Sequence, residues 1–128
     1  MKRIALALAV FVSLMIPTIS HAEWMEIGTV RGNTFFVDSK VRKHDGHIYF
    51  WELIDYLRPF KDGVLSVKTY IEGDCGRFRV RYLQGSFHKQ PMGRGAPSSG
   101  GQLDNTWEYS PPGSARAAVL AKACKLAD

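Results

Sequence analysis

Apolar and polar residues alternate along most of the chain between residues 24 and 110, and this period of two predicts β-strands. Turn-forming residues such as glycine, asparagine and aspartate interrupt the pattern at 31–33, 45–46 and 61–63, and Pro59 ends one of the runs. The strands that we expect span residues 24–30, 34–38, 47–57, 64–75, 78–87 and 106–110.

The sequence also predicts a central strand at 47–57 and a long loop at 88–105. Residues 47–57, HIYFWELIDYL, are apolar at both alternating sets of positions in their middle, which predicts a central strand covered on both faces. Asp45 and Gly46, which precede this strand, form a strong hairpin-turn signal. Residues 88–105 are rich in glycine, proline and serine, so we expect a long mobile loop there.

The pattern changes after the Pro-Pro-Gly sequence at 111–113. Ser114 is a suitable N-cap, and the following residues are good helix formers. The residues expected on one apolar face of this helix are Ala117, Leu120, Ala121, Cys124 and Ala127, with Lys122 and Lys125 pointing away. Because the face is mostly alanine, such a short helix would be marginal alone and needs an attachment to the rest of the fold.

The first residues have the organisation of a secretory signal peptide. Lys2 and Arg3 precede the apolar run 4–16, and small residues precede a cleavage point after Ala22. The apolar run is too short for a membrane span, which needs about 20 residues. The leader contains no cysteine, so a lipoprotein is not predicted. We therefore expect residues 1–22 to be removed and the mature chain to be periplasmic or secreted, without a transmembrane segment.

The mature chain, residues 23–128, has the length of a single domain. The net charge of the full sequence is +5, and loss of Lys2 and Arg3 with the leader makes it milder. Such a charge favours solubility and some affinity for acidic surfaces, but it is not typical of a dedicated nucleic-acid-binding protein.

Cys75 and Cys124 are the only cysteines, and both lie in the exported part. An even cysteine count in an oxidising compartment predicts a disulfide, which would stabilise the fold by roughly 4 kcal/mol by closing a long loop. The alternative is a nucleophilic Cys75 activated by nearby arginines, but no histidine lies close in the sequence to act as its base. The expected fold class is therefore α+β: a mainly antiparallel sheet of about six strands with a C-terminal helix tethered by the disulfide to one face.

The stretch IEGDCGRFRVRY at 71–82 predicts a hairpin with Gly76 and Arg77 at the centre of a type II′ turn. In this register one face is apolar and carries Cys75, and the other face is charged. The charged face has opposite charges directly across from each other, in the pairs Glu72–Arg81 and Asp74–Arg79. Cross-strand pairing therefore accounts for these arginines without a nucleic-acid partner.

No catalytic, cofactor or metal constellation is predicted. His44 and His47 flank the 45–46 turn and lack the further ligands of a zinc site, so we expect exposed turn residues. Glu52 and Asp55 are separated by an odd number of positions on one strand, so they point to opposite faces and do not form a carboxylate pair. Trp24, Trp51 and Trp107 are expected in the core, and an exposed one would indicate a binding surface.

Several short motifs occur in an order that resembles the surface-adhesin protein E family of Gram-negative bacteria. They are Trp24, FFVD at 35–38, FWELIDY at 50–56, SVKTYIEGDC at 66–75, RFRVRYL at 77–83, WEYSPPGS at 107–114 and Cys124 in the final helix. The resemblance covers nearly all of residues 23–128. It implies a six-stranded antiparallel sheet with a C-terminal helix held on its concave face by the Cys75–Cys124 disulfide, and it also implies a homodimer.

The resemblance implies a non-enzymatic binding module with a protein partner, such as the host matrix or serum proteins laminin, vitronectin and plasminogen. The family's named member is a surface lipoprotein, and this sequence departs from it in having no lipobox cysteine. The main hypothesis is thus a small exported adhesin-like binding protein. The alternative is a periplasmic structural or accessory factor of an envelope complex.

Overall fold

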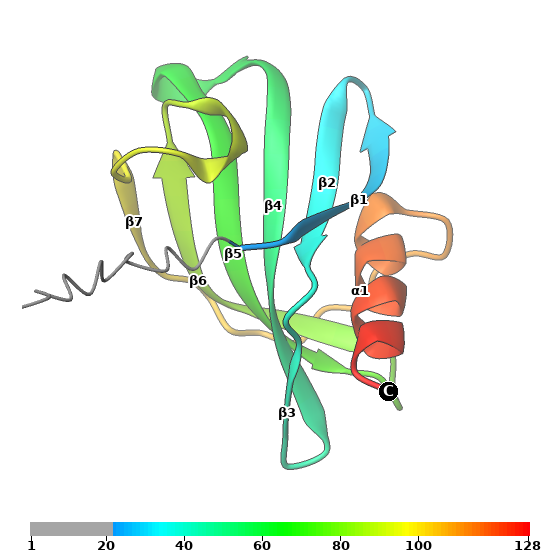
Figure 1. Cartoon of the computed structure of the whole chain (residues 1–128). Coiled ribbons are helices and arrows are strands. Elements are labelled where there is room, and N and C mark those ends of the chain that lie inside the picture. The colour runs from blue at the N-terminus through cyan, green and yellow to red at the C-terminus, as the bar shows by residue number, and fades with distance from the viewer. Residues whose placement is uncertain (1–21) are drawn as a thin grey trace, which may run out of the picture.

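The computed structural model describes residues 22–128, in which a seven-stranded antiparallel sheet is accompanied by one long helix (Figure 1). The strands run in the order β1-β2-β4-β5-β6-β7, and the short β3 also pairs with β4. The bounds are β1 Trp24–Val30, β2 Asn33–Asp38, β3 Arg42–His44, β4 His47–Phe60, β5 Val64–Asp74, β6 Arg79–His88, β7 Ser99–Gln102 and α1 Ala115–Leu126, with 3-10 turns η1 Lys61–Gly63 and η2 Pro91–Gly93. The predicted fold class is confirmed, whereas the predicted leader lies outside the described residues except for Ala22.

The observed strands and loops differ from the predicted ones in four places. β3 was not expected, because all three of its residues are polar and exposed and so lack an alternating pattern. Residues 88–105 are not one loop, since they contain η2 and β7. The strand expected at 106–110 is reduced to an isolated bridge between Val80 and Glu108. Pro59 lies inside β4, where pairing with β5 is interrupted between Asp55 and Phe60, so its missing N–H breaks no regular ladder.

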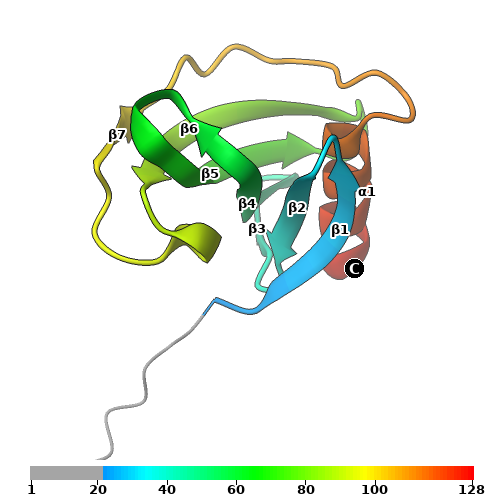
Figure 2. The same cartoon turned by 90° about the horizontal axis from the view of Figure 1, so that it is seen from above.

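The sheet has two faces that are distinguished by the alternation of β4. Ile48 and Phe50 point to the side covered by α1, which we call the helix face. Tyr49 and Trp51 point to the other side, which we call the open face. Figure 2 shows α1 beside β1 and β2 at one side of the sheet, and α1 packs against β1, β2 and β4.

The hydrophobic core lies between the helix face and α1. It contains Val37, Ile48, Phe50, Ile71, Val80 and Tyr82 from the sheet and Val119, Leu120 and Ala123 from the helix. Gly73 permits a close approach of the helix to the sheet, because a Cβ atom at this position would lie 2.9 Å from Cδ1 of Leu120. Burial of these side chains is the main force that holds α1 on the sheet.

The helix begins as predicted, since the Ser114 hydroxyl accepts a hydrogen bond of 3.1 Å from the Ala117 amide. The predicted apolar face is partly wrong. Val119 and Ala123 are buried, whereas Ala121 is exposed. Alanines occur on several sides of this helix and give a weak pattern, so the larger Val119 and Leu120 side chains decide which side meets the core.

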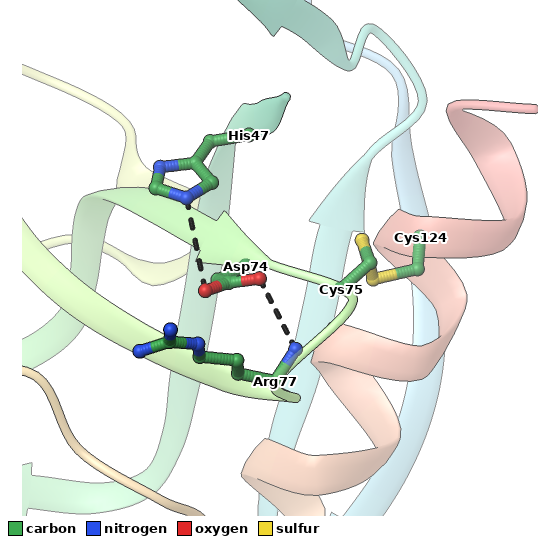
Figure 3. Close-up of a disulfide and its surroundings, with 5 residues drawn as sticks. All are labelled: His47, Asp74, Cys75, Arg77 and Cys124. Atoms are coloured by element: carbon green, nitrogen blue, oxygen red, sulfur yellow. Dashed lines mark hydrogen bonds and ion pairs between the residues drawn. A yellow bond between two sulfur atoms is a disulfide. The ribbon is translucent and has the colours of Figure 1, made fainter. Parts of the chain in front are cut away.

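A disulfide between Cys75 and Cys124 joins the turn after β5 to α1 (Figure 3). The two Cα atoms are 5.9 Å apart, although the residues are separated by 49 positions in the sequence. Residues 22–128 contain no free cysteine, so Cys75 is not available as the nucleophile considered above. The helix is therefore held at one end by a covalent bond and along its length by the core.

The β5–β6 hairpin has the register that the sequence predicted, with Glu72 opposite Arg81 and Asp74 opposite Arg79. Its turn differs from the predicted type II′. Residues 75–78 form a four-residue turn in which Phe78, rather than Gly76, has a positive φ of 52°. The Asp74 carboxylate accepts a 3.1 Å hydrogen bond from the Arg77 amide, and this bond stabilises the longer turn (Figure 3).

Candidate binding groove on the open face

A groove of about 870 Å3 lies on the open face. Strand pairing brings its residues together from distant parts of the sequence, because Trp24 pairs with Asp38, Arg42 with Tyr49 and Trp51 with Tyr70. The floor is formed by β4 and β5, one side by β1, the end of β2 and β3, and the opposite side by η2. The groove is therefore a product of the whole sheet and not of one loop.

Three aromatic rings form the floor of the groove. The Trp51 and Tyr70 ring centroids are 4.9 Å apart, and those of Tyr49 and Tyr70 are 6.2 Å apart. Trp24 lines the groove from β1. All four side chains are only partly buried, so part of their surface remains available to a ligand.

The expectation that all three tryptophans lie in the core is wrong. Trp24 and Trp51 line the groove, and Trp107 packs on arginines elsewhere on the open face. The period-two rule places 49 and 51 on one face of β4, but only the register with β5 puts Tyr70 opposite Trp51 and next to both rings. The sequence therefore predicts that Tyr49 and Trp51 share a face, but it does not predict that Tyr70 joins them in one aromatic floor.

The charged residues around the groove are mostly cations. They are Lys40, Arg42, Lys68 and Arg94, and the only carboxylate that the described residues place in the lining is that of Asp38. Asp38 is 6% exposed, and its Oδ1 accepts a 3.0 Å hydrogen bond from the Lys40 amide. Within residues 22–128, Arg42, Lys68 and Arg94 have no carboxylate oxygen within 4.0 Å. The groove therefore has a positive electrostatic potential.

Polar side chains of β4 and β5 attach the η2 wall to the sheet. The Ser66 hydroxyl donates a 2.6 Å hydrogen bond to the Gln90 carbonyl and accepts one of 2.8 Å from the Gly93 amide. The Asp55 carboxylate accepts a 2.8 Å hydrogen bond from the Met92 amide. These bonds satisfy the backbone of a short segment that has little regular structure of its own.

His88, which is 2% exposed, completes the attachment of this wall. Its Nδ1 lies 3.2 Å from the Gly95 carbonyl, which only accepts, so Nδ1 carries the proton. Its Nε2 lies 2.9 Å from the Ser86 hydroxyl, which donates to it when the ring is neutral. At Gly93 a Cβ atom would lie 2.9 Å from Cδ of Lys68, so glycine allows the wall to contact the stem of this lysine. The wall is held in place by contacts from three strands.

A second polar cluster lies on the same face, where β4 and β5 continue beyond the groove. His47 donates from Nδ1 to Glu72 at 2.7 Å, and Arg81 contacts the other oxygen of Glu72 at 2.8 Å. Arg79 donates to Asp74 at 3.0 Å. Trp107 lies under both guanidinium groups. The centre of its ring is 4.2 Å from Cζ of Arg79 and 4.6 Å from Cζ of Arg81.

Electrostatics keep the two acids of this cluster ionised. Burial opposes ionisation of Glu72, but hydrogen bonds from His47 and Arg81 outweigh it and lower the Glu72 pKa. The Arg77 amide lowers the pKa of Asp74, and Arg79 adds to this effect. The expectation that His47 is an exposed turn residue is wrong, since its side chain is 30% exposed and bonded to Glu72. His44 is an exposed turn residue and lies 3.1 Å from Asp45.

Glu52 lies on the opposite face of the sheet from these groups. It is 1% exposed on the helix face, and neither carboxylate oxygen has a hydrogen-bond partner within the part of the chain that the structure describes. Burial raises the pKa of Glu52 to about 7, although the charge of Arg116 opposes the shift. Asp55 points to the open face and contacts Met92, so the two acids are separated by the sheet.

The lining of the groove is made mostly of aromatic and charged side chains. Among residues 22–128, this lining offers ring surfaces and cations, and no nucleophile with an adjacent base. In the part of the chain that the structure describes, no three His, Cys, Asp or Glu side chains are grouped to hold a metal ion. Among residues 22–128, no helix has the length and apolar character needed to cross a bilayer.

Comparison with known proteins gives one family and one fold. The sequence profile described as surface-adhesin protein E matches residues 24–125. The structure of Haemophilus influenzae protein E in crystal form II superposes with a TM-score of 0.64 at 13% identity, covering 85% of this chain and 92% of that one. A second structure of Haemophilus influenzae protein E gives 0.63 at 12% identity, with 85% and 89% coverage.

A third structure, of protein E from non-typeable Haemophilus influenzae, has a TM-score of 0.57 at 13% identity and covers 85% of this chain and 77% of that one. No curated protein matches the sequence. At these identities the solved structures establish a common fold.

Proposed function

Because the chain belongs to the surface-adhesin protein E family, we propose that it is an exported, non-enzymatic, adhesin-like binding protein. Its partners in this proposal are host extracellular-matrix or serum proteins, and the groove on the open face is the place where they bind. Cleavage after Ala22 and assembly as a homodimer belong to the same proposal.

One observation carries this proposal: a preformed groove that combines partly exposed aromatic rings with cations, of which Arg42, Lys68 and Arg94 have no carboxylate oxygen within 4.0 Å among residues 22–128. Aromatic and arginine side chains are the residues that contribute most to protein interfaces. Trp24, Trp51 and Arg42 provide such groups here. The wall formed by η2 is already bonded to the sheet, so little ordering is required when a partner binds.

Binding of the mature chain to immobilised matrix and serum proteins tests the proposal. We expect saturable binding at micromolar protein, weakened by Trp51→Ala. Tyr109→Ala is the matched control, because Tyr109 is 64% exposed and lies outside the groove. If no matrix or serum protein binds saturably, the adhesin hypothesis is wrong. Cross-linking in the native envelope would then identify the partners of an accessory factor instead.

A further inference from the structure

The rings on the floor of the groove are tilted relative to one another and do not form a single flat plane. The planes of Tyr49 and Trp51 are tilted by 35° and 34° relative to Tyr70, which lies next to both. The electron-rich face of an aromatic ring attracts the polarised C–H groups on one side of a pyranose. Neighbouring rings at different tilts therefore suit a chain of puckered sugar units.

The cations determine which sugars fit. Arg42 and Lys68 belong to β3 and β5, on either side of the Tyr49 and Trp51 positions of β4, and Arg94 lies just after the η2 wall. Asp38, which supplies the one lining carboxylate among residues 22–128, is buried and accepts a hydrogen bond from a backbone amide. Cations on both sides of a row of rings are complementary to carboxylate or sulfate groups that project from a sugar chain.

We propose that the groove binds an acidic oligosaccharide, a chain of pyranose rings that carry carboxylate or sulfate groups. The inference rests on the proposed function, because it uses the same groove, and it specifies the ligand as the glycan of a matrix component rather than its polypeptide.

An acidic peptide matches the charge less completely than a glycan does. An extended peptide binds a sheet by pairing with an exposed edge strand. The floor of this groove lies over β4 and β5, whose edges are already occupied by β2, β3 and β6. The free strand edges of β1 and β3 lie at the side of the groove rather than on its floor. A peptide that lies on the rings would therefore meet side chains and cations and would gain no backbone pairing.

Single-stranded nucleic acid also uses aromatic rings and cations. Its bases stack best on parallel planes, whereas the rings here are tilted. The predicted export of the chain also separates it from nucleic acid. An oligonucleotide is therefore included in the test as a competing ligand.

Titration calorimetry on the disulfide-bonded mature chain tests the proposal, with a heparin-derived hexasaccharide as the probe. The comparison ligands are neutral cellohexaose, a hexaglutamate peptide and a short oligothymidylate. At about 0.15 M salt, where exposed charges are screened beyond about 8 Å, we expect the hexasaccharide to bind at least about tenfold more tightly than each of the others.

Two variants separate ring contacts from charge. Trp51→Ala removes a ring without changing charge, and we expect about tenfold weaker binding of the hexasaccharide. Arg42→Ala removes an exposed cation and should weaken the hexasaccharide while leaving cellohexaose unchanged. The matched controls are Tyr109→Ala for the ring and Lys125→Gln for the charge, and both should bind as the wild type does.

Equal affinity for hexaglutamate, tighter binding of oligothymidylate, or an unchanged affinity in Trp51→Ala would each overturn the proposal. A comparison with intact matrix proteins distinguishes this failure from failure of the proposed function. Matrix binding that survives enzymatic removal of the acidic glycans, together with no hexasaccharide binding, overturns only the glycan inference. Absence of both kinds of binding overturns both.

Discussion

Replacement of the buried Glu52 by glutamine tests how the fold tolerates an acid in its interior. The carboxyl group is 1% exposed and has no hydrogen-bond partner among the described residues. Burial raises the pKa of Glu52 from its usual value of 4.5 to about 7. Glu52→Gln keeps the shape of the side chain and removes its ionisation.

The direction of the effect follows from the raised pKa. Below pH 4.5 the carboxyl group is protonated in both the folded and the unfolded chain, so its ionisation does not affect stability. As pH rises toward 7, the unfolded chain loses this proton first, and the free energy of unfolding falls by about 1.4 kcal/mol per pH unit. Above pH 7 the accumulated loss is on the order of 3 kcal/mol, and Glu52→Gln avoids it.

Urea unfolding with the disulfide intact, followed by tryptophan fluorescence, measures this effect. The useful quantity is the change in unfolding free energy between about pH 4 and about pH 8, compared between variant and wild type. Every other titrating group is common to both proteins and cancels in this comparison. The wild type should lose on the order of 3 kcal/mol more than Glu52→Gln over this range.

Glu26→Gln is the matched control, because it makes the same chemical change at an exposed glutamate of β1. The amide of Glu52→Gln brings two donors into a buried site, so the variant has a penalty of its own at every pH. This penalty does not alter the pH dependence. Parallel pH profiles of the wild type and Glu52→Gln would refute the argument that a buried, unpaired carboxyl group destabilises the fold above neutral pH.

Three further substitutions test the attachments of the helix, the hairpin and the groove wall. Cys124→Ser should lower the unfolding free energy by roughly 4 kcal/mol; a wild-type melting temperature unaffected by reductant would contradict this. Arg81→Glu should cost roughly 2 kcal/mol by facing Glu72 with a like charge, and adding Glu72→Arg should restore part of it; no restoration would contradict the pairing. Asp55→Ala should cost about 1 kcal/mol and accelerate exchange of the Met92 amide, whereas unchanged exchange would show that this bond does not hold the wall.

Two features whose determinants lie close together in the sequence were predicted correctly, as was one long-range bond. The β5–β6 register is an example, because Glu72 and Arg81 belong to one hairpin and only one alignment satisfies both apolar and charged faces. The cap at Ser114 depends on the three residues that follow it. The disulfide between Cys75 and Cys124 followed from cysteine count and expected compartment, without geometry.

Features that depend on which distant segments become neighbours were decided by the tertiary structure. The sequence contains the aromatic residues at 49, 51 and 70, but the groove exists only because β4 pairs with β5 and η2 is bonded to both. The burial of Glu52 and the orientation of α1 likewise depend on packing between the sheet and the helix. Local alternation determines which face of a strand a side chain occupies, whereas the packing of separate segments determines what that face meets.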